Sequence, residues 1–243
     1  MSNAKALIPL GLILALGLVI STYLVTKFAR EVVMAHQIIK VRGYAEIPVE
    51  SDLAIWHITV KAKDRDLAKA YPVLASHREA VIAFLKENGV KFDETKIFPV
   101  QVGEHNIRTE NGHKTSEIEA FQLSQDITVN SKDVHNISKI ATSIAELLGR
   151  GVNFKTEMPG YYFTGVNALK STLLVEATKD ARMRAKTLAE GSGANLGPLR
   201  AARQGIFSVQ SAYSSSIAEE ASDDVWSIAK KVTAVVTFDY IMR

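Results

Sequence analysis

The N-terminal segment Ala6–Thr26, ALIPLGLILALGLVISTYLVT, runs for 21 residues without a charged side chain. An α-helix rises about 1.5 Å per residue, so a helix of this length just spans the roughly 30 Å hydrocarbon core of a bilayer. Pro9 falls in the first turn, where its missing N–H does no harm. The segment therefore predicts a transmembrane helix with residues 6–26 in lipid, inside an N-terminal membrane anchor of residues 1–36.

The residues that follow the apolar run favour an uncleaved anchor over a cleaved signal peptide. A signal peptide has a shorter apolar region that ends in small residues. Here the sequence continues as TKFAREVVMA, with bulky and charged side chains in that place. Cleavage after Ala35 is the weaker alternative because Lys27 and Arg30 intervene. Basic residues stand on both sides of the run, so the positive-inside rule leaves the orientation open.

The composition restricts the class of protein to which the remaining residues 37–243 can belong. The chain is 47% apolar and 23% charged, which is typical of a globular protein. Its net charge is +3, whereas nucleic-acid-binding domains carry a strong basic excess, so we expect no nucleic-acid partner. It contains no cysteine, which excludes disulfides, thiolate metal sites and cysteine nucleophiles. No segment is typical of a long linker, and we expect one domain over 37–243.

Hydrophobic periodicity and turn residues predict alternating strands and helices after the anchor. We expect strands at 38–50, 52–63, 96–108, 116–130, 152–162, 198–209 and 225–242, and helices at 66–88, 131–148 and 165–191. Gly89 is the expected end of the first helix and Ser131 the expected N-cap of the second. The order ββαββαβαββ predicts an α+β fold with helices packed on a mixed or antiparallel sheet.

The last of these helices contains the basic, glycine-ended stretch ATKDARMRAKTLAEGSGANLG at 177–197. A stripe of small and apolar residues recurs every three or four positions through it: Leu169, Leu173, Ala177, Ala181, Ala185 and Leu188. Lys179, Arg182 and Lys186 lie away from this stripe, which predicts a packed helix with a solvated basic face. A dinucleotide-binding loop has its glycines before a helix, whereas Gly191 and Gly193 follow one. We therefore interpret these glycines as the helix C-terminus and the turn after it.

The search for catalytic or metal-binding motifs finds no strong candidate. The six histidines form no paired helical motif such as H-E-x-x-H. His105, His113, Glu104 and Glu110 flank the predicted hairpin turn Asn111-Gly112, which we interpret as a polar exposed turn. There is no G-x-S-x-G motif, and we expect the serine-rich segment Ser208–Ser222 to be a loop. The sequence predicts no catalytic residue, cofactor or metal, and a protein that is not an enzyme.

Four segments of the chain together follow the pattern of one protein family. They are Ile39–Pro48 followed by Asp52-Leu53-Ala54, the helix end Val81–Val90, the alanine-rich helix with Gly191 and Leu196-Gly197, and the final strand Val232–Phe238. In these segments the chain resembles the SIMPL-domain family of bacterial cell-envelope proteins. The resemblance covers nearly all of residues 37–243. The insertion Val49-Glu50-Ser51 departs from the family pattern, in which proline and aspartate are usually adjacent. The resemblance implies export to the periplasm and an association with envelope or oxidative stress, and it supplies no catalytic residues.

These observations favour a single-pass protein of the bacterial inner membrane whose C-terminal domain faces the periplasm. We expect it to act as a scaffold or binding protein and to self-assemble into a ring-like homo-oligomer. Small residues spaced four apart in the anchor, Gly11/Ala15 and Gly17/Ser21, and unprotected strand edges support self-association. Two alternatives stay open: an envelope hydrolase or metal-dependent enzyme whose site forms only in three dimensions, and a pore-like or lipid-contacting assembly. The sequence identifies no small-molecule or protein ligand.

Overall fold

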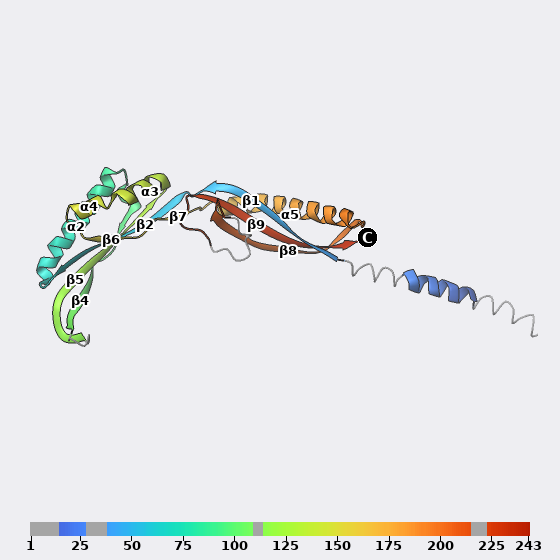
Figure 1. The fold of residues 1–243 in the computed structure, drawn as a ribbon, viewed down its shortest axis with the longest axis horizontal. Coiled ribbons are helices and arrows are strands. Elements are labelled where there is room, and N and C mark those ends of the chain that lie inside the picture. Colours follow the sequence, from blue (N-terminus) through green and yellow to red (C-terminus); the bar gives the residue numbers. More distant parts are fainter. Residues whose placement is uncertain (1–14, 28–37, 109–113, 215–222) are drawn as a thin grey trace, which may run out of the picture. The chain divides into compact units, whose positions relative to one another are not determined.

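The computed structural model describes residues 15–27, 38–108, 114–214 and 223–243 (Figure 1). Its strands are β1 Ile38–Glu50, β2 Leu53–Asp64, β3 Thr95–Ile97, β4 Gln101–Arg108, β5 Lys114–Ser131, β6 Phe154–Thr156, β7 Gly160–Tyr162, β8 Leu196–Ser211 and β9 Ala229–Met242. Its α-helices after residue 38 are α2 Leu67–Glu87, α3 Val134–Ser143, α4 Glu146–Gly149 and α5 Val166–Gly191, with a short 3-10 helix at Phe92–Glu94. The expected α+β class is confirmed.

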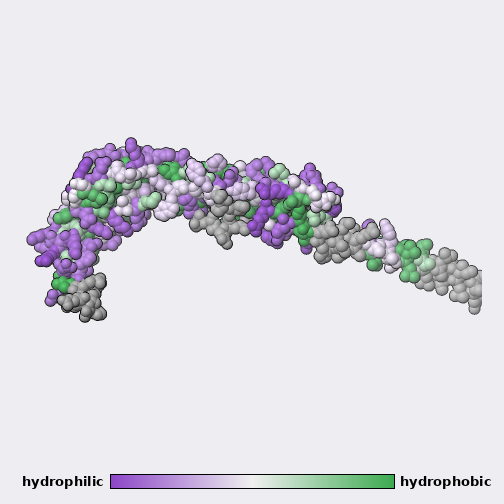
Figure 2. Space-filling view, in the orientation of Figure 1, coloured by the Kyte–Doolittle hydropathy of each residue, from purple (hydrophilic) through white to green (hydrophobic). Residues whose placement is uncertain are grey.

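The N-terminal apolar run is described only in part. Residues 15–27 form a helix, which Figure 2 shows as mostly hydrophobic. Within the described ranges, no helix is both long enough and apolar enough to cross a membrane. Residues 6–14 of the predicted span, and residues 28–36 of the predicted anchor, lie outside those ranges. The transmembrane assignment therefore stays a prediction.

The chain after the N-terminal helix divides into two compact units. Unit 1 contains Met1–Glu46, Lys170–Phe207 and Thr233–Arg243, and unit 2 contains Ile47–Leu169 and Ser208–Val232. The chain passes between the units inside β1, α5, β8 and β9, so no linker separates them in sequence.

Unit 2 is built on a six-stranded antiparallel sheet. Its strand order is β3-β5-β2-β6, with β4 also paired to β5 and β7 also paired to β2. Helices α2 and α3 pack against β2, and Figure 1 shows α4 on the same side of the sheet. Alternate residues of β2 point into the resulting core and are almost fully buried: Ala54, Trp56, Ile58, Val60 and Ala62. This alternation is the pattern that predicted a strand with one buried face.

Two strands that we expected to be continuous are each divided at a proline. The segment 96–108 becomes β3 and β4, which are separated around Pro99, and the segment 152–162 becomes β6 and β7, which are separated around Pro159. Proline has no N–H to donate to a neighbouring strand, so it interrupts the hydrogen-bonded ladder.

The bounds of α2 are close to those expected, whereas the start of α3 is not. Asp66 precedes α2 and accepts a hydrogen bond from the Ala68 backbone N–H, and Gly89 follows the helix with a φ of +85°. For α3, however, the expected N-cap Ser131 is wrong. Ser131 ends β5, and Asp133 is the N-cap, with its carboxylate 2.9 Å from the Asn136 backbone nitrogen. Strand pairing with Ala54 extends β5 through Ser131 and displaces the helix start by two residues.

Unit 1 consists of a three-stranded sheet in the order β1-β9-β8 with α5 packed on it. Strands β8 and β9 are antiparallel, since Asn195 and Arg243 exchange two backbone hydrogen bonds of 2.6 and 2.9 Å. The buried stripe of α5 recurs every four residues: Leu173, Ala177, Ala181, Ala185 and Ala189, all 0% exposed. The predicted stripe is thus confirmed from Leu173 to Ala185. At its start Leu169 is only partly buried, and at its end Leu188 is 54% exposed and Ala189 takes its place. A helix that contacts a neighbour along its i, i+4 ridge gives this spacing.

Small residues let α5 lie very close to β1. A Cβ atom added at Gly43 would lie 2.0 Å from the Ala177 carbonyl oxygen. Nearby, the Asp180 carboxylate accepts hydrogen bonds from the Tyr44 backbone N–H and from Arg184 Nε at 2.9 and 2.8 Å. Strand β1 lies at the edge of its sheet, so this contact satisfies one backbone donor that would otherwise be open to another strand. Burial, together with the neighbouring Glu46 carboxylate, raises the pKa of Tyr44 above its ordinary value.

The glycines after α5 close the helix, as the sequence predicted. Gly193 has a φ of +77°, a left-handed conformation that favours glycine, and its N–H donates to the Glu190 carbonyl oxygen. The following strand is longer than expected. Because β8 continues through Ser211, the predicted loop does not begin at Ser208, whose side chain is buried in the strand. Residues 215–222 of that predicted loop lie outside the described ranges.

Candidate functional site

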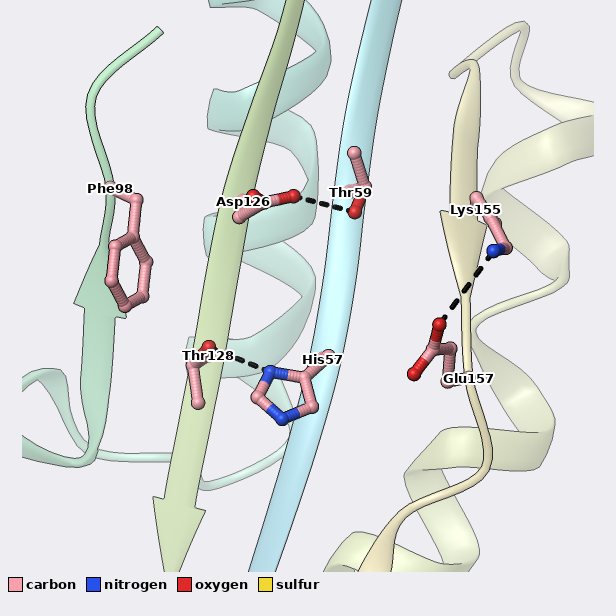
Figure 3. A pocket seen from close by; sticks show the side chains of 7 residues that line it. All are labelled: His57, Thr59, Phe98, Asp126, Thr128, Lys155 and Glu157. Atoms are coloured by element: carbon pink, nitrogen blue, oxygen red, sulfur yellow. Dashed lines mark hydrogen bonds and ion pairs between the residues drawn. The ribbon is translucent and has the colours of Figure 1, made fainter. Parts of the chain in front are cut away.

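A hollow of about 340 Å³ lies on the face of the unit 2 sheet opposite its helices. Figure 3 shows the side chains that line it: His57 and Thr59 from β2, Asp126 and Thr128 from β5, Lys155 from β6, and Phe98 and Glu157, which directly follow β3 and β6. The hollow combines one aromatic wall with several ionisable and hydroxyl groups.

Strand periodicity and register bring the central residues together. Trp56 and Ile58 point into the core, so the alternate residues His57 and Thr59 project from the other face of β2. In the antiparallel pairing with β5, His57 lies opposite Thr128, and Thr59 lies opposite Asp126. Directly opposed residues share one face of a sheet, so the two polar pairs stand side by side at the floor of the hollow.

Hydrogen bonds fix these floor residues. His57 Nδ1 lies 2.9 Å from Thr128 Oγ1, and Thr59 Oγ1 donates to Asp126 Oδ1 at 2.7 Å. Gln101 Nε2 donates to the other carboxylate oxygen of Asp126 at 3.4 Å. Asp126 thus has neutral hydrogen-bond donors and, in the part of the chain that the structure describes, no lysine or arginine partner. These hydrogen bonds therefore fix the orientation of the Asp126 carboxylate, and neither donor neutralises its charge.

The walls come from the strands on either side. On one side, Lys155 Nζ and Glu157 Oε1 form an ion pair at 3.6 Å. On the other, the Phe98 backbone N–H donates to the Asp126 carbonyl oxygen at 2.9 Å, which places the ring beside the floor, and Lys96 Nζ lies 4.8 Å from its centroid. The lining groups carry the two carboxylates of Asp126 and Glu157 and the Lys155 ammonium, and Lys96 places a second ammonium against the Phe98 ring, so the formal charges around the hollow balance.

This arrangement is better suited to binding than to nucleophilic catalysis. A hydroxyl nucleophile needs an adjacent base that a third group orients. Thr128 is beside His57, but its side chain is nearly buried, and no acidic group among the described residues bonds to His57. Nor do the described ranges contain a cluster of three or more histidine or acidic side chains able to hold a metal ion. His105 instead bonds to Gln122, and His113 and Glu110 lie outside those ranges.

A second polar group lies at the start of β9, and the sequence did not suggest it. The side chain of Lys230 is fully buried, and its Nζ is 3.2 Å from Asp224 Oδ2 and also bonds to the Asp224 carbonyl oxygen. Burial raises the pKa of Asp224, but hydrogen bonds with Ser227 and Trp226 and the Lys230 ammonium outweigh it, so the pKa lies below its ordinary value. These contacts bind the turn before β9 to the strand.

The hollow is not identifiable from the sequence alone. His57 is one of six histidines that form no paired motif, at an outward position of the predicted strand 52–63. The usable signal was that both predicted strands carry polar residues at outward positions, His57 and Thr59 on one and Asp126 and Thr128 on the other. The register between β2 and β5 was needed to show that these residues face each other, and it is not readable from either strand alone.

Comparisons with known proteins identify the family and no activity. No curated protein matches the chain. A hydantoinase/carbamoylase family amidase from Burkholderia ambifaria is 12% identical over 51% of this chain and 33% of its own, with a TM-score of 0.29. The regulatory subunit of aspartate kinase from Thermus thermophilus is 12% identical over 81% of this chain and 88% of its own, with a TM-score of 0.18. The chain spans about a third of the amidase, and neither likeness is close enough to carry an argument.

The family model for SIMPL, described as "Protein of unknown function (DUF541)", matches residues 39–240. The match includes β1, both units and almost all of β9. It confirms the resemblance seen in the sequence, and the chain belongs to the SIMPL family.

Proposed function

We propose that this protein is a membrane-anchored, periplasm-facing binding protein of the bacterial cell envelope, and that the unit 2 hollow binds a small ligand with an ammonium group. The observation that carries the binding role is the oriented, unneutralised carboxylate of Asp126 beside the Phe98 ring. A carboxylate that is held in place without an ion-pair partner suits an ammonium group, which it binds through a charge-assisted hydrogen bond. Lys155 is already paired with Glu157, so Asp126 has room for an external partner.

The binding role is tested by titrating the full-length protein with ethanolamine, using ethylene glycol as a neutral probe of nearly the same size. We expect heat of binding in calorimetry with ethanolamine alone. Asp126→Asn keeps the shape of the side chain but removes its charge, and should weaken binding by roughly tenfold or more. Glu146→Gln on α4 makes the same chemical change away from the hollow and should leave the affinity unchanged. Equal binding of both probes, or an unaffected Asp126→Asn variant, would contradict the proposal.

The proposed location is the inner membrane, with a single N-terminal helix as anchor. Its support is the uncharged run of residues 6–26 and the hydrophobic helix at residues 15–27. The charges around the run do not select an orientation, so the periplasmic side rests on the family resemblance. A helix that stays in the membrane would keep every copy of the protein in one plane, which raises the effective concentration of the copies.

Self-assembly into a ring-like homo-oligomer is the second part of the proposal, and the free edge of β4 favours it. Among the described strands, β4 pairs only with β5. Val102 and Ile107 on β4 are 56% and 41% exposed, so this edge combines open backbone groups with apolar side chains. Such edges pair readily with a strand of another chain. A repeated contact between this edge and a different surface of the next copy would close a ring if the rotation allows it.

The remaining alternatives have less support. The hydroxyl beside His57 is that of the nearly buried Thr128, which is a poor position for a nucleophile, and we therefore propose binding without catalysis. A pore-like assembly would need an apolar belt around the assembled domains.

A further inference from the structure

The two units differ strongly in charge, although the net charge of the whole chain is small. Leaving aside residues 1–37, unit 1 contains ten Lys and Arg and five Asp and Glu residues. Unit 2 contains sixteen and twenty, respectively. Unit 1 is therefore basic and unit 2 acidic, and an anionic surface attracts unit 1 selectively.

The outer side of α5 concentrates part of this basic charge. Lys179, Arg182 and Lys186 follow one another at spacings of three and four, so they share one side of the helix, away from the buried alanine stripe. All three are exposed. Lys179 pairs with Glu176 at 2.8 Å and Lys186 with Glu190 at 3.7 Å, but both pairs are exposed and exchange readily with other anions. Arg182 has no partner within the described part of the chain.

Exposed apolar side chains lie among these basic residues. Val175 and Met183 are 53% and 63% exposed on α5, although the helix already buries its alanine stripe against the sheet. We call Lys179, Arg182, Lys186, Val175 and Met183 the basic face of α5. Lysine and arginine beside exposed apolar groups are typical of helices that lie on a bilayer surface, where the cations meet phosphate groups and the apolar side chains enter the headgroup region.

The N-terminal chain leads into this same unit. Ile38 at the start of β1 follows Lys27, the last residue of the described helix at 15–27, by eleven positions. Eleven residues extend to at most about 40 Å. When the N-terminal helix is in the bilayer, unit 1 is therefore held close to the headgroups. This step rests on the proposed anchor, whereas the charge and exposure of the basic face do not.

We infer that the basic face of α5 binds the anionic phospholipid surface of the membrane in which the protein is anchored. The ligand is the phosphate headgroup of lipids such as phosphatidylglycerol. The anchor holds unit 1 near the membrane, and the basic face of α5 then determines which side of unit 1 lies against it.

The test uses the absence of cysteine in the sequence. Met183→Cys provides a single thiol for a polarity-sensitive fluorophore on the full-length chain. The protein is reconstituted into vesicles of phosphatidylcholine alone, or of equal parts phosphatidylcholine and phosphatidylglycerol, with a lipid-attached quencher. We expect quenching at position 183 only with phosphatidylglycerol, and its loss at 1 M salt, where the screening length falls to about 3 Å. The same probe at Tyr71→Cys, on α2 of unit 2, should not respond.

Charge reversal gives the quantitative control. Combining Lys179→Glu, Arg182→Glu and Lys186→Glu should lower the ratio of membrane-bound to free α5 by at least roughly a hundredfold, since each lost basic residue contributes about fivefold at an anionic surface and the new carboxylates add repulsion. Lys69→Glu, Lys132→Glu and Lys139→Glu together make the same charge change on exposed positions of unit 2 and should have no effect. Thermal melts of both triple variants confirm that they are folded.

Flotation of the vesicles separates the two proposals. If the protein floats with both lipid mixtures but the probe at position 183 does not respond, the proposed lipid contact is wrong and the proposed anchor is supported. If the protein floats only with phosphatidylglycerol and the probe responds, the lipid contact is supported and the proposed anchor is wrong. If the protein floats with neither lipid mixture, both the anchor and the lipid contact are wrong. A response to soluble heparin but not to phosphatidylglycerol would assign the basic face to an anionic polymer and overturn the lipid contact.

Discussion

Gly43→Ala is expected to destabilise unit 1 by about 3 kcal/mol or more. The added Cβ would lie 2.0 Å from the Ala177 carbonyl oxygen, 2.6 Å from Ala181 Cβ and 2.7 Å from the Ala181 nitrogen. Two of these are backbone atoms of a packed helix, so no side-chain rotation relieves the clash. Either α5 lifts from β1 and exposes its alanine stripe, or β1 leaves the sheet. Both changes remove the main packing contact of the unit.

Urea unfolding followed by circular dichroism measures this effect, and Gly191→Ala is the matched control. Gly191 ends α5, has no atom within 4 Å of an added Cβ, and is not in a left-handed conformation. Alanine favours a helix over glycine, so the control should be unchanged or more stable by up to about 1 kcal/mol. A Gly43→Ala variant as stable as the control would mean that α5 does not pack on β1 as described.

Trp56→Ala should lower the free energy of unfolding of unit 2 by about 3–5 kcal/mol. The Trp56 side chain is 0% exposed at the centre of the core that β2 forms with α2 and α3. Its indole N–H also donates to Thr156 Oγ1 at 2.7 Å and to the Glu157 carbonyl oxygen at 3.1 Å. The substitution leaves a large cavity and releases the segment that carries one wall of the hollow.

Trp56→Phe distinguishes the two contributions, because it keeps most of the volume and removes only the donor. Its cost should be about 1–2 kcal/mol. Chemical denaturation gives the free energies, and the exposed Trp226 remains as a fluorescence reporter in both variants. Equal costs for alanine and phenylalanine would show that the hydrogen bonds, and not the packing, stabilise this position.

Local signals in the sequence were enough for β1 and α5, but not for the expected helix 131–148, which the structure divides into α3 and α4. The expected strand 38–50 coincides with β1, and the expected helix 165–191 differs from α5 by one residue, because periodicity and terminal glycines are local features. The errors have two causes, one local and one not. Pro99 and Pro159 divide strands whose hydrophobic pattern continues through them, and strand pairing at Ser131 overrides its preference for a helix N-cap.

The division into units and the candidate site depend on contacts between distant residues. No linker marks the units, because the chain passes between them inside regular elements. Thr59 and Asp126 are 67 positions apart, and their contact follows from the register of two strands. A shift of one residue would point one member of each pair into the core. The sequence therefore contained the residues of the hollow, but not the information that they meet.

We propose that this SIMPL protein works as a self-assembled domain held at a membrane by its uncleaved N-terminal helix. Native mass spectrometry of the full-length protein, extracted from membranes in detergent, tests both parts in one measurement. This proposal predicts complexes of several copies, each with the 26.6 kDa mass of residues 1–243. Single copies, or chains that begin near His36, would contradict it.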